Sequence, residues 1–321
     1  MKKSLLKTLT LLVGGLFLAS CVNAEPASSI ESKPEAPISN SLPTSGTTSL
    51  PPEVSQLIAP ANEETPMPTY DIATKTFIFD VGVEKHSYIV TGRFEGRFLV
   101  NDTTLTEYKG ITFKLNNAIL SNNEEGGSVF LYQPHSKAIT IEALKDTNNS
   151  VTAKGTAISS VNNVNLCGSG TIAIKSATEH AVKGDDVRCY GSATINIDGS
   201  GKDGLHGKNF FTDDGGDGAE KKIFNGTINL KAITKQAFDF CNDKDWSGSI
   251  NLISTSVVNV VSCENVFKSD TKIVLDGKVT ATGIVDKAIA KDKANPNGIL
   301  VLVSGEVSFN GTVLAPNTYN Y

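Results

Sequence analysis

The sequence has little of what builds helical proteins. Its 321 residues include two Met, one Trp and few Leu-rich stretches. After residue 70, Val, Ile, Thr, Asn, Ser and Gly dominate instead, and these residues favour strands and tight turns. We therefore expect an all-β protein, with enough chain for one large domain or two ordinary ones.

Positive charge is also scarce. The formal net charge is −5, and it falls to −8 (−5 minus +3) if Lys2, Lys3 and Lys7 are removed with a signal peptide. No basic patch offsets this sign, which argues against nucleic acid as a partner. An anionic ligand would need a bridging cation or a local basic groove. Only three arginines occur in the chain, too few for an arginine-lined catalytic groove.

The first twenty residues have the pattern of a bacterial lipoprotein signal peptide. Lys2 and Lys3 precede an apolar run over residues 5–18, which is too short for a comfortable membrane span. Residues 18–21 read Leu-Ala-Ser-Cys, a small-residue cleavage site that resembles a lipobox. We expect Cys21 to carry acyl chains, palmitate included, that anchor the protein to a membrane. Val22 follows instead of Asp, which favours the outer membrane or the cell surface. The alternative is a plain signal peptide with a cysteine nearby.

Residues 21–70 have the composition of a tether. Nine of the twelve prolines lie between residues 22 and 70, among Ser, Thr, Ala and Glu. Such a segment buries too little apolar surface to offset the entropy lost on ordering. We predict a disordered tether over residues 21–70 and a folded domain over residues 71–321.

One phrase repeats along the folded part, with a small residue two positions before an isoleucine. It occurs at residues 167–174, 190–197, 223–230 and 245–252, and its first isoleucines are Ile172, Ile195, Ile228 and Ile250. The spacings are 23, 33 and 22 residues, and the longest contains an insertion at 212–218. A second apolar position follows each isoleucine by ten residues, at Val182, Leu205, Phe238 and Val260.

Two strand positions at a constant offset predict a right-handed, single-stranded parallel β-helix. An antiparallel sandwich also has short strands, but it does not predict that offset. Fainter copies at residues 113–115, 139–141, 273–275 and 300–302 extend the repeat both ways. Residues 77–100 alternate apolar and polar side chains and would form an N-terminal β cap.

The same alignment makes a prediction about the cysteines. Cys241 and Cys263 each lie 13 residues after the first isoleucine of their repeat. On adjacent coils they would stack within reach of a disulfide, and an extracytoplasmic compartment permits one. The alternative is a stack of buried thiols. Cys167 and Cys189 are not equivalent, because aligning the Gly-Ser pairs sets Cys167 opposite Tyr190. No Cys-x-x-Cys pair is present, which argues against a zinc site.

Acidic residues gather in the expected turns. If stacked coils bring them together, they could hold Ca²⁺, which takes six to eight oxygen ligands. The alternative is that Asp-Gly turns serve only the backbone geometry. The candidate metal ligands are Asp185, Asp186, Asp203, Asp213, Asp214, Asp217 and Asp239.

Three segments in this region carry a family resemblance. Residues 181–186 read Ala-Val-Lys-Gly-Asp-Asp, residues 191–197 read Gly-Ser-Ala-Thr-Ile-Asn-Ile, and residues 202–208 read Lys-Asp-Gly-Leu-His-Gly-Lys. Together they resemble bacterial β-helical surface proteins of a carbohydrate-binding domain family, over about residues 75 to 305. The resemblance implies a pectate-lyase-like fold and an association with calcium and with plant-type polysaccharides, acidic ones included. Residues 236–239, Gln-Ala-Phe-Asp, depart from the family's second Asp-Gly-Ile-Lys.

These features predict an envelope lipoprotein that binds polysaccharide without cleaving it, through a calcium-assisted flank of the β-helix. Direct contacts would come from Lys183, Arg188, His206 and Lys208. One alternative is a structural or adhesive surface protein. A second, less favoured, is a polysaccharide lyase in which Arg188 or Lys208 takes a proton.

Overall fold

The structure is a computed structural model that describes residues 50–80, 84–101, 109–216, 220–242, 246–292, 295 and 297–321. The signal peptide, Cys21, the tether up to residue 49 and the metal candidate Asp217 lie outside the described residues. Within the described part, no helix is long and apolar enough to cross a membrane.

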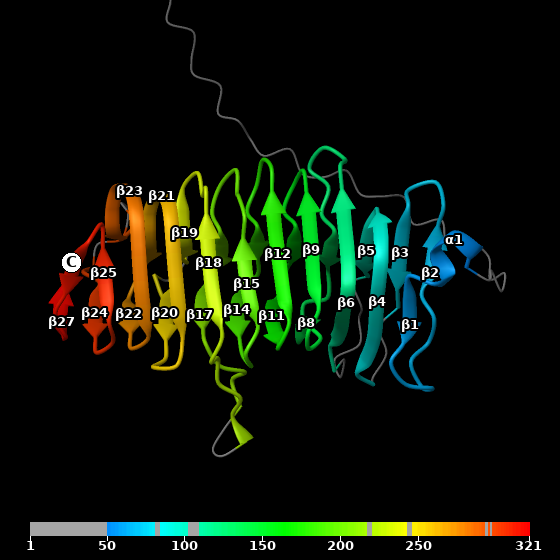
Figure 1. The fold of residues 1–321 in the computed structure, drawn as a ribbon, viewed down its shortest axis with the longest axis horizontal. Coiled ribbons are helices and arrows are strands. Elements are labelled where there is room, and N and C mark those ends of the chain that lie inside the picture. The colour runs from blue at the N-terminus through cyan, green and yellow to red at the C-terminus, as the bar shows by residue number, and fades with distance from the viewer. Residues whose placement is uncertain are drawn as a thin grey trace, which may run out of the picture. The chain divides into compact units, whose positions relative to one another are not determined.

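The described chain winds into a parallel β-helix whose strands form three ladders, named A, B and C here (Figure 1). Ladder A has nine parallel strands, one for each coil. The all-β, parallel β-helix prediction is therefore confirmed. Ladder A comprises β4 (His86–Glu95), β6 (Ile111–Asn122), β8 (Ala138–Ala143), β11 (Asn163–Gly168), β14 (Asp186–Cys189), β17 (Asn209–Phe211), β20 (Ser249–Leu252), β22 (Lys272–Leu275) and β24 (Leu300–Val303).

Four long strands turn a corner and serve two ladders. The second halves of β4 and β6 open ladder B, and the second halves of β21 and β23 close ladder C. Ladder B continues through β9 (Asn148–Ala153), β12 (Thr171–Ser176), β15 (Thr194–Ile197), β18 (Thr227–Lys231), β21 (Val257–Ser269), β23 (Lys278–Ala290) and β25 (Val307–Phe309). Ladder C comprises β3 (Thr76–Phe79), β5 (Arg97–Val100), β7 (Phe130–Tyr132), β10 (Ile158–Ser160), β13 (Val182–Lys183), β16 (Leu205–Gly207) and β19 (Gln236–Phe240) before it reaches β21.

Inward side chains of each ladder stack along the axis and form the core. In ladder C, Val182, Leu205 and Phe238 lie in register on successive coils and are fully buried. Toward the N-terminus the stack becomes aromatic, with ring centroids of Phe98 and Phe130 5.1 Å apart. Because inward and outward residues alternate along every strand, one slip in register would expose a whole stack, and this fixes the coil alignment.

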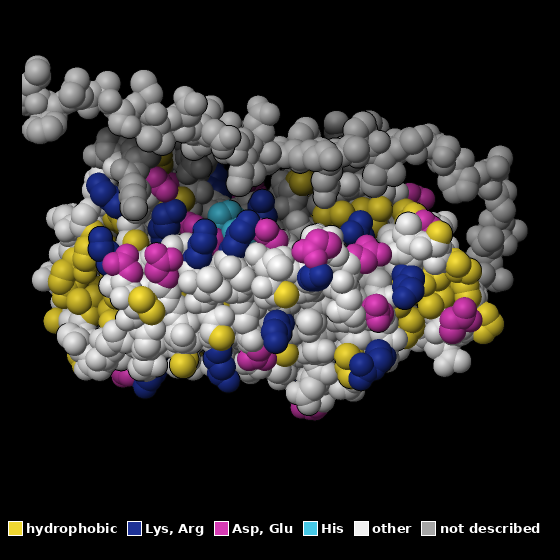
Figure 2. Space-filling view, turned by 90° about the horizontal axis from the view of Figure 1, so that it is seen from above, with side chains coloured by type: hydrophobic (Ala, Val, Ile, Leu, Met, Phe, Trp, Pro, Cys, Tyr) yellow, Lys and Arg dark blue, Asp and Glu magenta, His cyan; other side chains and the backbone are white. Residues whose placement is uncertain are grey.

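Antiparallel strands cover the ends of the ladders. At the N-terminal end, β1 (Ile58–Pro60) pairs with β4 and β2 (Thr69–Asp71) with β3. At the other end, β26 (Thr312–Leu314) pairs with β25, and β27 (Asn317–Asn320) with β24. Such pairing removes exposed strand edges, which otherwise recruit other chains. Figure 2 shows hydrophobic side chains gathered at both ends of the described body.

The N-terminal cap begins earlier than the sequence predicted. The short helix α1 (Pro52–Ser55) and β1 lie inside the segment expected to be a tether, and Ile58 is 1% exposed. The proline-rich composition hid this element because its few apolar residues, Val54, Leu57 and Ile58, are all used in the core. The folded part therefore starts near residue 50 and not at residue 71.

The predicted repeat alignment is right for three copies and wrong for the fourth. Ile172, Ile195 and Ile228 stack in ladder B. The next residue in that stack is Val258, not Ile250. Ile250 instead stacks on Phe210 in ladder A. The 22-residue step from Ile228 to Ile250 is thus only part of a coil, which imitates a full repeat in length and composition.

This shift overturns the disulfide prediction. Cys241 follows β19 at the end of ladder C, whereas Cys263 pairs with Ile284 where β21 passes from ladder B to ladder C. Both are free thiols. The register between β11 and β14 does place Cys167 next to Tyr190, as the glycine alignment predicted.

Candidate functional site

The predicted acidic residues do not gather at one point. Asp186 and Asp213 lie near Arg188 on ladder A, whereas Asp203 and Asp239 lie on the ladder C side. Asp214 accepts hydrogen bonds from the backbone N–H groups of residues 216 and 222, so it closes its own turn. Asp185 is exposed on the corner between the two ladders. The insertion that carries Asp213 and Asp214 projects from the ladders (Figure 1).

Arg188 is the centre of the ladder A group. Its guanidinium lies 3.2 Å from Asp186 and 3.2 Å from Asp213, and its Cζ lies 4.2 Å from the ring centroid of Phe211. Asn209 donates to the other oxygen of Asp186 at 2.9 Å. Two carboxylates and an aromatic face therefore hold this planar cation in one orientation.

A shallow groove of about 270 Å³ runs from this arginine toward the N-terminus. It crosses the start of ladder A over five successive coils, from β4 to β14. Its cationic side chains are Lys85, Lys109, Lys137 and Arg188, and its neutral polar side chains are Thr140, Asn163, Asn165 and Tyr190. We call this surface the basic groove.

The lysines of the basic groove come from three consecutive coils. Lys85, Lys109 and Lys137 each stand one or two residues before the ladder A row formed by His86, Ile111 and Ile139. All three are exposed. Lys109 also lies 3.3 Å from Glu84, and Asp214 is the one acidic side chain in the lining. The groove is therefore locally basic on a protein whose overall charge is negative.

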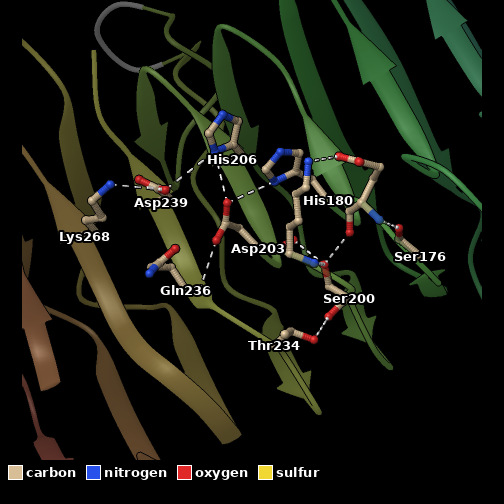
Figure 3. Close-up of polar contacts among 11 residues, drawn as sticks. Ser176, His180, Ser200, Asp203, His206, Thr234, Gln236, Asp239 and Lys268 are labelled. Atoms are coloured by element: carbon tan, nitrogen blue, oxygen red, sulfur yellow. Dashed lines mark hydrogen bonds and ion pairs between the residues drawn. The ribbon is translucent and has the colours of Figure 1, made fainter. Parts of the chain in front are cut away.

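The second group lies on ladder C and contains two histidines. Val182 pairs with Leu205, which places His180 and Asp203 side by side at the entry to β13 and β16. His180 Nδ1 lies 3.0 Å from Asp203 Oδ2, and His206 Nδ1 lies 3.4 Å from the same oxygen. The two rings stack with centroids 4.1 Å apart (Figure 3). We call His180, Asp203 and His206 the His-Asp-His cluster.

Outward residues of ladder C continue the polar row. Lys183, His206, Asp239 and Lys268 are register partners on successive coils. Asp239 Oδ2 lies 3.8 Å from His206 Nδ1 and 3.6 Å from Lys268 Nζ. In Figure 2, histidine atoms reach the surface between Lys or Arg and Asp or Glu side chains.

Burial and these contacts shift several pKa values. Burial alone would raise the pKa of Asp203, but its contacts with both imidazoles and with the Gln236 N–H outweigh burial and hold the pKa well below its usual value. Burial lowers the pKa of His180, against the pull of Asp203. Burial raises the pKa of Asp239, although Lys268 opposes the rise. Asp203 is therefore an anion next to a neutral His180 near pH 7.

The described acids do not match what calcium requires. Asp186 and Asp213 are engaged by Arg188, and Asp203 faces imidazole nitrogens, which are poor ligands for a hard cation. Among the residues that the structure describes, the His-Asp-His cluster is the one group of three or more His, Cys, Asp or Glu with convergent ligand atoms. The calcium expected from the resemblance stays a prediction without a matching ligand set in this part of the chain.

The predicted ligand-binding residues are divided between two faces. Arg188 lines the basic groove, whereas Lys183 and His206 lie on ladder C, and Lys208 follows β16 at the next corner. The sequence reading missed the three groove lysines and His180. A signal was available, because Lys109 and Lys137 each precede one of the faint repeats by the same two residues.

Comparisons with known proteins agree with this fold. A family model described as carbohydrate-binding domain-containing protein matches residues 78–304. Among solved structures, the chain is similar to the polysaccharide lyase-like protein from C. thermocellum, determined as a gadolinium derivative. The match has a TM-score of 0.53 and 13% identity, and it covers 72% of this chain and 99% of that one. No curated protein matches the chain.

Proposed function

Because the chain belongs to the family of carbohydrate-binding domain-containing proteins, we propose that it binds polysaccharide along the basic groove of ladder A. The observation that carries this proposal is the run of polar and cationic side chains over five coils. Neighbouring coils lie about 4.8 Å apart. A sugar chain laid along the axis would therefore meet a new set of donors at each coil.

The charge of the groove favours an acidic polysaccharide. Lys85, Lys109, Lys137 and Arg188 provide four cations against the single acidic lining residue Asp214. Arginine can bind a carboxylate through two parallel hydrogen bonds, and lysine acts as a point charge. An acidic protein can thus hold an acidic polymer without a bridging cation. Calcium bridging at the turns is the alternative route to the same ligand.

We further propose that binding is not followed by cleavage. A lyase needs a base beside the proton that it removes. The Arg188 guanidinium is held by Asp186 and Asp213, an arrangement that suits a fixed binding cation. The lysines of the groove are exposed, which suits contacts with a solvated ligand.

The proposal includes the cellular setting expected from the sequence. A lipid on Cys21 would hold the protein at the outer membrane or cell surface, and the segment that follows would let the β-helix reach a polymer outside. If so, Cys21→Ser should move the protein from the membrane fraction to the soluble fraction and abolish labelling by radioactive palmitate.

Binding to polygalacturonate in EDTA tests the proposed function. We expect retention on polygalacturonate in the presence of EDTA, weaker retention on neutral glycans, and no release of unsaturated product absorbing in the ultraviolet. Retention that disappears in EDTA would support calcium bridging instead. Absence of retention on every glycan would reject polysaccharide binding, and unsaturated product would identify a lyase.

A further inference from the structure

We propose that the His-Asp-His cluster is a binding site for a divalent transition metal of the zinc type. The inference goes beyond polysaccharide binding and does not depend on it, because the cluster lies on ladder C and the basic groove on ladder A. The sequence argued against zinc only through the absence of paired cysteines. It could not show that two histidines 26 residues apart meet through the coil register.

The geometry of the cluster fits one metal ion. The ligand atoms His180 Nδ1, Asp203 Oδ2 and His206 Nδ1 all lie within 4.8 Å of one another, with two separations of 3.0 and 3.4 Å. A tetrahedral metal with bonds of about 2.0–2.1 Å separates its ligand atoms by about 3.4 Å. Three protein ligands can therefore surround one ion with little movement.

Buried atoms of the cluster lack the partners that a metal-free arrangement should supply. The Nδ1 atoms of His180 and His206 are buried and have no hydrogen-bond partner. Their distances to Asp203 are short, but the nitrogens are not aligned for donation to that oxygen. His180 is 9% exposed and Asp203 is 3% exposed. Leaving buried polar atoms unmatched costs about 1–3 kcal/mol each, and a shared metal ion would satisfy both nitrogens.

The surroundings would orient and complete the site. The backbone N–H of Gln236 donates to Asp203 Oδ1 at 3.1 Å, which fixes the carboxylate from behind in the way that supporting hydrogen bonds do at metal sites. Asp239 lies next to His206, and its Oδ1 is buried without a hydrogen-bond partner. It can approach as a fourth ligand or receive a metal-bound water.

The donor types decide between metals. Two imidazole nitrogens and a carboxylate suit Zn²⁺ and its neighbours in the first transition series. Calcium prefers oxygen ligands throughout. We therefore expect Zn²⁺ and Co²⁺ to bind in the presence of excess Ca²⁺.

Titration of the full-length, tag-free protein tests the site. After treatment with EDTA and buffer exchange, isothermal titration calorimetry with zinc chloride should show one site per chain. Co²⁺ should give visible absorption bands of a coordinated ion. His206→Gln should weaken Zn²⁺ binding at least about tenfold and remove the Co²⁺ bands. His135→Gln, at an exposed histidine, is the matched control and should leave both unchanged.

A folding defect must be separated from a binding defect. Asp203→Asn keeps the shape of the side chain, and thermal unfolding in EDTA reports whether each variant is folded. Loss of Zn²⁺ binding in folded His206→Gln or Asp203→Asn would confirm the site. Absence of one-site binding to the wild type would overturn the proposal and leave a metal-free cluster. Wild-type affinity in folded His206→Gln would overturn it as well.

Discussion

Single buried polar residues are the points at which this β-helix departs from its apolar stacks. Asn149 stands in the inward row of ladder B, directly below Ile172, Ile195 and Ile228. It is 3% exposed. It accepts from the Ala118 N–H at 2.9 Å and donates to the Thr171 carbonyl at 3.0 Å. Its role is to satisfy backbone groups at the corner, where the ladder is interrupted.

Replacing this residue separates packing from hydrogen bonding. Asn149→Leu would extend the isoleucine stack, but it would leave the buried Ala118 N–H without a partner. We expect the free energy of unfolding to fall by about 1–3 kcal/mol, measured by urea denaturation. Thr152→Leu, at an outward position of the same strand, should change it by less than about 0.5 kcal/mol. A variant Asn149→Leu as stable as the wild type would show that packing decides at this site.

His86 links stability to pH. It is 8% exposed, and burial lowers its pKa from the usual 6.5, against the pull of the Asp80 carbonyl and Glu84. Below pH 6.5 the unfolded chain therefore binds more protons than the folded one, so stability should fall as the pH drops from 6.5 through the lower folded-state pKa. Thermal unfolding between pH 7 and pH 4.5 should show this decline.

The decline should be smaller in His86→Gln, because glutamine does not titrate. His135→Gln, at an exposed histidine, should keep the wild-type pH profile. Identical profiles for the wild type and His86→Gln would contradict the assignment to His86.

At the scale of elements, the corners between ladders decide how coils align. Gly168 stands at the corner from ladder A to ladder B with φ +105°, and Gly191 stands on the next coil with φ +80°. A Cβ on Gly168 would overlap the carbonyl oxygen of Ala143 on the coil below. This corner needs glycine for both conformation and close approach.

Two alanine substitutions separate these requirements. Gly168→Ala should cost about 1–2 kcal/mol for the left-handed conformation and an additional amount for the overlap. Gly126→Ala shares a positive φ, +67°, but its Cβ would have open space, so only the conformational cost applies. Urea denaturation should therefore rank Gly168→Ala below Gly126→Ala, and equal stabilities would contradict the close approach.

The corners also show how far the sequence could predict the fold. Repeats with regular corners, such as those of Ile172 and Ile195, were aligned correctly because every coil there has the same length. Alignment failed at Ile250, because the 33-residue coil and the corner after Cys241 imitate a repeat in length. The basic groove was missed for a related reason. Its lysines lie on the faint repeats, whose corners differ in length, so side chains 24 and 28 residues apart had no visible common row.

At the scale of the whole molecule, the β-helix separates two kinds of chemistry onto two faces. Ladder A carries the basic groove, and ladder C carries the row of Lys183, His206, Asp239 and Lys268. Net negative charge keeps other anions away from most of the surface, whereas the groove is locally of the opposite sign. An acidic polymer should therefore bind at one face and in one direction along the axis.

The most direct test of this account is the affinity of two charge-matched variants for polygalacturonate in EDTA. Lys109→Glu/Lys137→Glu reverses two charges in the basic groove, and Lys175→Glu/Lys231→Glu reverses two exposed charges on ladder B. Both variants have the same net charge, so non-specific repulsion cancels in the comparison. We expect the groove variant to bind at least about tenfold more weakly than the ladder B variant. Equal affinities of the two variants would contradict binding along ladder A.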